Sequence, residues 1–357
     1  MSVMVVMAGG TGGHVFPALA VARRLRERGV NIVWLGTKDG LEARLVPQAG
    51  FDIEWISIRA LRGKGLWGMV RTPFLVLTAM VQALGVVLKR RPNALLGVGG
   101  FVAGPGGLVA WLLRRPLVIH EANAIAGFTN RMLSHLADRV LTGFPGTFGK
   151  RKRVVHVGNP VRPEIAALPP PEVRLRGRAG PLRLLIVGGS LGARALNEIV
   201  PAAVAGLAPG SVEIRHQCGR GRTPEVEALY RRHNVAARVM DFIEDMAEAY
   251  SWADFVVCRA GAMTVAEIAA AGQAALFVPF PYAVSDHQAA NAAYLAERDA
   301  ALMIRQQELT PERLRAELHA LVGDPARILA LAGKARSLAM PNATDEVARV
   351  CQEVCGA

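Results

Sequence analysis

Short apolar runs recur along the chain and alternate with segments that have the periodicity of amphipathic helices. Each run is bounded by Gly, Pro or polar residues, as buried strands usually are. Strands that alternate with helices predict parallel sheets joined by right-handed crossovers, which is the α/β class. The runs lie at residues 3–8, 31–36, 53–58, 94–99, 116–120, 139–142, 154–157, 183–188, 212–217, 238–243, 254–258, 275–278 and 300–304, and clear helical patterns at 15–28, 194–207, 224–233 and 288–297.

A glycine-rich turn follows an apolar run at two corresponding places. Residues 3–25 read VMVVMAGGTGGHVFPALAVARRL, and residues 183–204 read RLLIVGGSLGARALNEIVPAAV. Each predicts a strand, a tight turn and a helix whose N-terminus attracts anions. Two such units predict two Rossmann-like parallel-sheet domains that face one cleft.

The length of 357 residues also favours two domains. The stretch 158–180 is rich in Gly and Pro and has little periodicity, which is typical of a linker. We therefore expect an N-terminal domain at 1–160, a C-terminal domain at 161–340 and a last helix at 341–357. That helix either packs on the second domain or crosses back to the first.

The net positive charge of the chain, +13, lies entirely in the first half. Residues 1–160 carry 21 Lys and Arg against 7 Asp and Glu, whereas residues 161–357 carry 21 against 22. This excess of basic residues could serve to keep the protein soluble, to bind nucleic acid or to bind an anionic membrane surface. Stacking aromatics are few and no nucleic-acid motif follows the basic clusters, so we expect no nucleic-acid partner.

An uncharged segment, Thr72–Leu88, lies between clusters of basic residues. A buried core helix fits this pattern, and so does a helix in a membrane interface, where the flanking cations attract anionic lipid. A membrane-spanning helix fits less well, because Pro73, Thr78 and Gln82 interrupt a segment at the short limit for spanning. The basic residues are Arg59, Arg62, Lys64 and Arg71 before the segment and Lys89, Arg90 and Arg91 after it.

Cysteine usage and the N-terminal sequence both favour a reducing cytoplasm. Four cysteines are too few for a disulfide framework, and no His or further Cys completes a metal set with the last two. No basic segment precedes an apolar one at the start, so we expect no secretory signal. The cysteines are Cys218, Cys258, Cys351 and Cys355.

The first glycine turn does not match a dinucleotide fingerprint. Counting G-x-G-x-x-G from Gly10 gives Gly12 and then Val15, so the third glycine is missing. This argues against NAD, although glycines still let a ligand approach the backbone closely. His14 falls at the predicted helix start, where a neutral imidazole can accept a proton from a substrate hydroxyl. A capping or core histidine is the alternative.

The second turn formally matches the nucleophile elbow G-x-S-x-G. A hydrolase of that kind needs an acid and then a separate histidine later in the chain, but Asp286 and His287 are adjacent. No HGGG-like oxyanion loop is present either. Ser190 and the backbone amides around it suit a diphosphate better.

A third glycine turn, residues 259–267, opens a helix after the apolar run ADFVVC. Its amides can also bind phosphate. The Glu267 carboxylate would repel phosphate but could accept both hydroxyls of a ribose; a plain glutamate near a helix start is the alternative. Gln288 and Asn291 are sugar-type hydrogen-bonding residues after another strand. The chain has no Asp-x-Asp pair to hold a metal, so we expect no metal and no other cofactor.

Together these sequence blocks resemble the MurG family, the peripheral membrane N-acetylglucosaminyltransferases of peptidoglycan synthesis in glycosyltransferase family 28. They run in the family's order and spacing from residue 3 to about residue 347. The blocks are GGTGGHVFPALA, GVGGFVAGP, HEANAIAGFTNR, VGNPVR, VGGSLGARALN, CRAGAMTVAEIAAAG and PFPYAVSDHQAANA.

The resemblance implies the GT-B fold and transfer of GlcNAc from UDP-GlcNAc to lipid I, undecaprenyl-pyrophosphoryl-MurNAc-pentapeptide. The product is lipid II, with a β-1,4 link and an inverted anomeric centre. The resemblance also implies that the protein is located at the cytoplasmic face of the inner membrane. Its partners there would be anionic phospholipid and other proteins of cell-wall synthesis and division. The N-terminal domain then binds the acceptor and the membrane, and the C-terminal domain binds the donor.

The resemblance also assigns the site residues. The first glycine loop lies at the cleft, Asn123 and Arg162 approach donor or acceptor, Ser190 meets the diphosphate, Ile243 meets uracil through its backbone, and Gln288 meets the sugar. The residues from 262 to 267 surround nucleotide and phosphate, with Glu267 on the ribose. The complete UDP-GlcNAc-binding set is Thr11, Gly12, Gly13, Asn123, Arg162, Ser190, Ile243, Ala262, Met263, Thr264, Val265, Ala266, Glu267 and Gln288.

Our catalytic hypothesis is that His14 acts as the general base. The acceptor 4-hydroxyl attacks the anomeric carbon from the face opposite UDP, and helix amides stabilise the leaving diphosphate. The chain departs from the family at three positions: it has Leu191, Ala122 and Ala260 where the family usually or often shows Gln, Gln and Ser. Two alternatives remain: a UDP-sugar epimerase of the same two-domain design, and a non-enzymatic protein that senses nucleotide sugars or scaffolds at the membrane.

Overall fold

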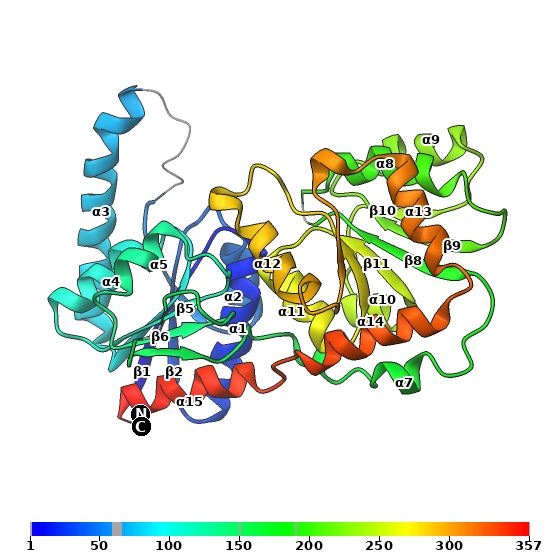
Figure 1. Cartoon of the computed structure of the whole chain (residues 1–357). Coiled ribbons are helices and arrows are strands. Elements are labelled where there is room, and N and C mark those ends of the chain that lie inside the picture. Colours follow the sequence, from blue (N-terminus) through cyan, green and yellow to red (C-terminus); the bar gives the residue numbers. More distant parts are fainter. Residues whose placement is uncertain (1, 59–65, 150, 190, 357) are drawn as a thin grey trace. The chain divides into compact units, whose positions relative to one another are not determined.

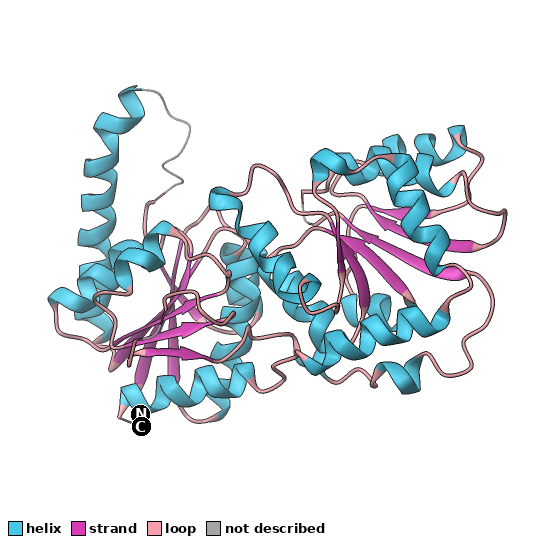
Figure 2. Ribbon diagram, in the orientation of Figure 1, coloured by secondary structure: helices cyan, strands magenta, loops and turns pink. Residues whose placement is uncertain are grey.

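The computed structural model describes residues 2–58, 66–149, 151–189 and 191–356. The chain divides into two compact units. The first comprises Met1–Val161 and Pro341–Ala357, and the second comprises Arg162–Met340. Each is a parallel sheet with helices on both faces (Figures 1 and 2).

The first unit has a seven-stranded sheet in the order β3-β2-β1-β4-β5-β6-β7. Its central strands are buried along their whole length, because helices cover both faces of the sheet. That arrangement explains why these strands are continuous apolar runs in the sequence. The strands are β1 (Val3–Ala8), β2 (Asn31–Gly36), β3 (Asp52–Trp55), β4 (Ala94–Gly99), β5 (Leu117–Glu121), β6 (Arg139–Thr142) and β7 (Val154–His156).

Two groups of helices cover the faces of this first sheet. The apolar sides of α1 and α15 pack in one core cluster, and those of α3 and α4 pack in another. Helix α15, which follows the second unit in the sequence, thus completes the core of the first. The helices are α1 (Gly12–Glu27), α2 (Glu42–Gln48), α3 (Leu66–Arg90), α4 (Ala103–Leu112), α5 (Phe128–Leu133) and α15 (Ala343–Cys355).

The second unit has a six-stranded sheet in the order β10-β9-β8-β11-β12-β13, which is the Rossmann order 3-2-1-4-5-6. Its strands are β8 (Leu182–Val187), β9 (Val212–Gln217), β10 (Arg238–Met240), β11 (Phe255–Cys258), β12 (Ala274–Phe277) and β13 (Leu302–Met303). Its helices are α6 (Pro163–Ala166), α7 (Pro171–Arg174), α8 (Arg194–Val204), α9 (Thr223–Arg232), α10 (Met246–Trp252), α11 (Ala262–Ala271), α12 (His287–Ala296), α13 (Pro311–Leu321) and α14 (Pro325–Ser337), with 3-10 turns at η1 (Val284–Asp286) and η2 (Gln306–Glu308).

These sheets confirm the expected α/β fold class. Strands are shorter than the apolar runs predict at β3, β10 and β13, and all three are edge strands. An edge strand has a hydrogen-bonding neighbour on one side only, so its pairing stops where that neighbour ends. The stretch 158–180 is also more ordered than a linker, because α6 and α7 bury Ile165 and Pro171.

Helix α3 is not the wholly buried core helix that was one alternative for Thr72–Leu88. Its small side chains Ala79 and Ala83 pack into the core, but Phe74, Leu77 and Val81 are 71%, 58% and 60% exposed. By length and composition alone Pro73–Arg90 could cross a membrane, yet one face of it packs on this unit. Part of the basic cluster before it, residues 59–65, lies outside the described residues.

Candidate functional site

Three glycine turns stand at the carboxyl ends of parallel strands. They follow β1, β8 and β11 and lead into α1, α8 and α11. At each helix the N-cap residue (Thr11, Ala193 or Gly261) makes no side-chain cap, and the first turn holds no acidic residue. The first backbone amides of these helices are therefore available to an anion, which the helix dipole also favours.

In the first unit, a buried glutamate fixes the first glycine turn. Both carboxylate oxygens of Glu42 are used. Oε2 accepts the Gly10 amide at 2.9 Å, while Oε1 accepts the Thr37 amide at 3.0 Å and the Thr37 hydroxyl at 2.7 Å. The ends of β1 and β2 are thereby tied together through one side chain.

His14 lies in the first turn of α1, with its ring against the end of β4. A Cβ added to Gly99 would stand 2.6 Å from His14 Nδ1, and one added to Gly100 would stand 2.4 Å from the Gly9 carbonyl. Both glycines have positive φ, 124° and 82°. The GVGGF segment therefore has glycines where the imidazole and the glycine turn approach the backbone most closely.

The loop that contains Asn123 is organised by Glu121, the last residue of β5. Oε1 of Glu121 accepts the backbone and side-chain N–H groups of Asn123 at 2.9 and 3.1 Å. Oε2 accepts the Gly127 amide and the Asn130 side chain, both at 3.0 Å. From the other side, Asn159 donates to the Ala122 carbonyl at 2.9 Å.

His120 is buried beside this loop and faces away from solvent. Its Nε2 donates to the Gly158 carbonyl at 2.9 Å. Burial lowers its pKa, the Gly158 carbonyl and the Glu121 carboxylate partly offset that effect, and the nearby His14 adds to it. His120 is therefore neutral at neutral pH, and a positive charge on either imidazole disfavours one on the other.

In the second unit, the turn after β8 packs directly on the end of β9. A Cβ on Gly192 would lie 2.2 Å from the Cys218 carbonyl, so only glycine fits there. The Gly192 amide donates to the Gly189 carbonyl at 2.8 Å and closes the turn. Leu191 is almost fully exposed at its tip. Ser190, a predicted diphosphate contact, lies outside the described residues.

Glu267 in α11 is buried and has charged and polar partners. Arg162 donates through Nε and Nη2 to Oε1 at 3.1 and 2.9 Å, and Tyr250 donates its hydroxyl to Oε2 at 3.4 Å. Burial raises the pKa of Glu267, and the Arg162 guanidinium partly offsets this rise. A ribose hydroxyl at this carboxylate would have to share it with those two partners.

Two amide side chains at the start of α12 hold the adjacent loops. Gln288 Oε1 accepts the Phe280 amide at 2.9 Å, and buried Asn291 donates to the Ala260 carbonyl at 3.2 Å. Ser285 and Asp286 both have φ near the left-handed region, at 54° and 53°. Non-glycine residues in that region store strain, which is common at ligand-binding loops.

The remaining predicted residues lie at the same sheet edge of their unit. Ile243 follows β10 and is half-buried, and Ala262 and Val265 are buried in α11, whereas Met263, Thr264 and Ala266 are partly exposed. The described residues contain no group of three or more His, Cys, Asp and Glu side chains that could hold a metal.

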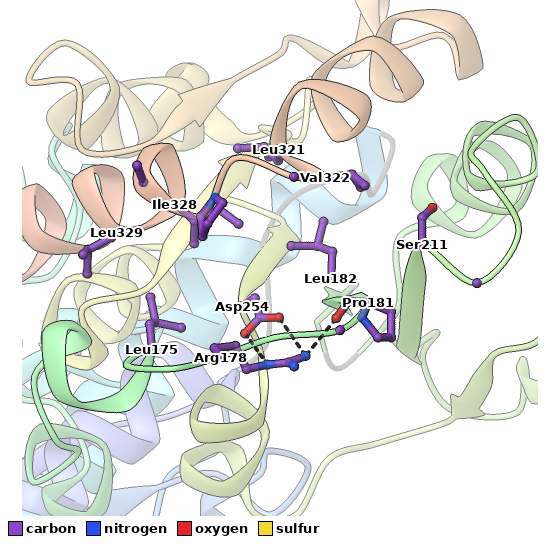
Figure 3. Close-up of a pocket in the computed structure, with 15 residues that line it drawn as sticks. Leu175, Arg178, Pro181, Leu182, Ser211, Asp254, Leu321, Val322, Ile328 and Leu329 are labelled. Carbon is purple, nitrogen blue, oxygen red and sulfur yellow. Dashed lines mark hydrogen bonds and ion pairs between the residues drawn. The ribbon is translucent and has the colours of Figure 1, made fainter.

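A cavity lies elsewhere in the second unit (Figure 3). It has a volume of about 790 Å³ and mainly apolar walls, including Leu175, Leu182 and Ile328, with the Arg178–Asp254 ion pair at one side. Leu182 begins β8, whereas the glycine turn follows the end of the same strand. The cavity is thus at the opposite sheet edge and is no part of the site.

Comparison with known proteins places this arrangement in a family. Residues 4–142 match the glycosyltransferase family 28 N-terminal domain, and residues 183–347 match its C-terminal domain. The chain is 54% identical over 351 residues to the UDP-N-acetylglucosamine--N-acetylmuramyl-(pentapeptide) pyrophosphoryl-undecaprenol N-acetylglucosamine transferase of Alkalilimnicola ehrlichii, with 98% of both chains covered. The crystal structure of Acinetobacter baumannii MurG is similar, with a TM-score of 0.85 and 44% identity over 99% of this chain and 100% of that one. The chain belongs to the MurG family of glycosyltransferase family 28.

Membership in the MurG family confirms the resemblance stated from the sequence, and it makes the chain a glycosyltransferase. UDP-GlcNAc 2-epimerase from Neisseria meningitidis has a TM-score of 0.70 at 11% identity, over 99% of this chain and 100% of that one. At that identity the likeness shows a shared fold alone.

Within this MurG-family chain the structure brings several predicted residues together. Thr11, Gly12, Gly13 and His14 share the first turn of α1, and Arg162 and Glu267 are in direct contact. Sequence reasoning did not select the residues that hold these loops in place. For two of these residues the sequence did carry a signal, since His120 and Glu121 are polar residues at the end of the apolar run LVIHE. The residues missed are Glu42, His120, Glu121, Asn130, Asn159 and Tyr250.

Proposed function

We propose that this chain transfers GlcNAc from UDP-GlcNAc to the 4-hydroxyl of MurNAc in lipid I, forming lipid II. The printed activity of relatives that match over nearly their full length supports this substrate pair. The structural observation that carries the proposal is the set of uncapped helix N-termini at the glycine turns. These are the sites that a transferase needs for a diphosphate leaving group when no metal neutralises it.

The second unit is the donor side. The N-termini of α8 and α11 face the same sheet edge as Ile243, Gln288 and Glu267, which gives phosphate-, base- and sugar-type contacts within one unit. As the bond from the anomeric carbon to the diphosphate oxygen breaks, negative charge grows on UDP. Backbone amides fixed in advance stabilise that charge without reorganising.

The first unit is the acceptor side, with His14 as the base. The acceptor 4-oxygen forms a bond to the anomeric carbon on the face opposite UDP, so the configuration inverts. Its proton passes to the His14 imidazole. The backbone of Gly99 lies close against that imidazole, and the nearby His120 is neutral at neutral pH.

A surface on α3, α4 and α5 of the first unit is the membrane-binding face, at the cytoplasmic side of the inner membrane. Helix α4 packs against α3 and also against α5 (Figure 1). Exposed arginines at the end of α4 add positive charge that anionic headgroups attract. The exposed apolar side chains of this face are Phe74, Leu77, Val81, Trp111, Leu112, Phe128 and Met132, and the arginines are Arg114 and Arg115.

The deciding experiment measures UDP release from UDP-GlcNAc, with and without a lipid I analogue, in EDTA. We expect release only with the acceptor, and we expect it to survive EDTA. Release without acceptor, together with formation of an epimerised sugar, would favour the epimerase alternative. Binding of UDP-GlcNAc without turnover on any acceptor would favour a sensing role.

A further inference from the structure

The side chain of Gln217, the last residue of β9, joins two loops at the donor edge of the second unit. The residue is buried, with 3% of its surface exposed. Its Oε1 accepts the Gly189 amide at 3.0 Å, and its Nε2 donates to the Gly189 carbonyl at 3.0 Å and to the Asp241 carbonyl at 2.9 Å. Both polar atoms of the amide are therefore used, one of them twice.

The hydrogen bonds from Gln217 to Gly189 hold the glycine turn against the end of β9. The Gly188 amide also donates to the backbone carbonyl of Gln217 at 3.1 Å, so two successive peptide groups of the turn are held by one residue. The amides of Gly188, Gly189 and Gly192 all donate within the protein. In this conformation a phosphate would meet the first amides of α8, whose position depends on how the turn before that helix is held.

The second loop that Gln217 contacts begins at Asp241, and the side chain of Asp241 fixes that loop in turn. The Asp241 carboxylate accepts the Gly221 amide at 2.8 Å and the Thr223 hydroxyl at 2.7 Å. These hydrogen bonds lower the pKa of Asp241, so it is charged at neutral pH. The segment that follows Asp241 contains Ile243, which we place at the uracil ring. Gln217 therefore spans the distance between the diphosphate turn and the base-binding segment.

We propose that Gln217 is a positioning residue that sets the spacing between the diphosphate turn and the base-binding segment of the donor site. The proposal rests on the proposed function of the second unit as the donor side. A leucine at 217 would retain most of the volume but none of the three side-chain hydrogen bonds. The turn would then lose its fixed orientation and with it the affinity for the diphosphate.

A matched control exists in the same unit. Gln273 is also fully buried, and its Nε2 donates to the Ala253 carbonyl at 2.7 Å. It precedes β12 and so lies at the opposite edge of the sheet from the glycine turns. Gln273→Leu thus removes a buried glutamine hydrogen bond from the same core without touching the donor loops.

The experiment compares Gln217→Leu, Gln273→Leu and the unmodified chain. Calorimetry gives the Kd for UDP, and kinetics give KM for UDP-GlcNAc and for the lipid I analogue. We expect Gln217→Leu to raise the donor KM and the UDP Kd about tenfold or more, with the acceptor KM within about twofold. Gln273→Leu should lower thermal stability and leave all three constants unchanged. A purely structural role for Gln217 would lower the active fraction without changing these constants.

Equal UDP affinity in Gln217→Leu and the unmodified chain would overturn the inference. If Gln217→Leu does not fold, Gln217→Glu decides the matter, because it keeps the acceptor for the Gly189 amide but places a carboxylate against two carbonyls. It too should weaken UDP binding, and unchanged binding would refute the inference. Failure of the unmodified chain to bind UDP would instead refute the donor-site proposal, and this inference with it.

Discussion

At the scale of single residues, the site depends on buried polar side chains that hold loops rather than on exposed ones. Glu42, Glu121 and Gln217 each bind backbone N–H groups at the end of a strand. A buried carboxylate or amide with all its partners is stable only in one arrangement, since a missing partner leaves a desolvated group unpaired. Glu42 and Gln217 therefore give two of the glycine turns a defined shape before substrate arrives. Glu121 does the same for the loop that contains Asn123.

Replacement of His14 tests the catalytic hypothesis. We expect His14→Ala to lower kcat by about 100-fold or more, the range for loss of a general base, while the Kd for UDP-GlcNAc changes little. The imidazole packs on the first unit, whereas the proposed base and ribose contacts, Ile243 and Glu267, belong to the second. Steady-state kinetics together with calorimetry separate the two effects. Parallel losses of turnover and donor affinity would show that His14 is not the base.

At the scale of elements, α3 shows how one helix can serve two environments. Its alanines pack on the sheet, and its larger apolar side chains point outward. An exposed apolar stripe of this size is unusual in a protein that meets only water. The continuous apolar sequence of Thr72–Leu88 concealed this division, because both faces of the helix are apolar and periodicity cannot separate them.

Vesicle binding tests the face on α3. Val81→Glu places a carboxylate on that face, and we expect it to weaken sedimentation with vesicles of phosphatidylglycerol and phosphatidylcholine at least several-fold, because a charge there is costly to bury and repels anionic lipid. Val173→Glu is a matched control, since Val173 is 54% exposed but lies on α7 of the second unit. Equal binding by both variants would remove α3 from the membrane contact.

At the scale of the whole molecule, each unit contains a histidine kept neutral by burial. In the second unit, His216 bonds Tyr230 at 2.9 Å and Asn197 at 3.1 Å, and burial lowers its pKa to about 3. In the first, burial lowers the pKa of His120. Below about pH 6.5 the unfolded chain therefore binds more protons at these histidines than the folded chain does. Acid therefore favours unfolding of both units.

We expect the free energy of unfolding to decrease as the pH falls below about 6.5. Each histidine can lower the folding equilibrium constant by up to about tenfold per pH unit. Urea unfolding at pH 7.5 and pH 5 measures it. His216→Gln should reduce the difference between the two pH values, whereas His319→Gln, at an exposed site on α13, should not. An unchanged difference in His216→Gln would contradict this explanation.

The sequence predicted the sheets well because strands covered on both faces must be apolar throughout. The glycine-rich segments could also be recognised in the sequence. At positions such as Gly100 and Gly192 another backbone segment lies so close that a Cβ does not fit, and only glycine can occupy them. The sequence could not predict the pairing of Arg162 with Glu267, which are 105 residues apart. Contacts of that kind depend on the tertiary arrangement, and a single sequence carries no local signal for them. The assigned ligand contacts remain predictions.

Helix α15 has a consequence for how the protein is made. It supplies Val347 and Cys351 to the same core as Val15 of α1, and its Asp345 pairs with Arg24 at 3.0 Å. During synthesis on the ribosome, the first unit therefore emerges with part of its apolar core uncovered and stays so until the whole second unit has been translated. The nascent chain is expected to depend on chaperones over that interval, and the unit that begins first is finished last.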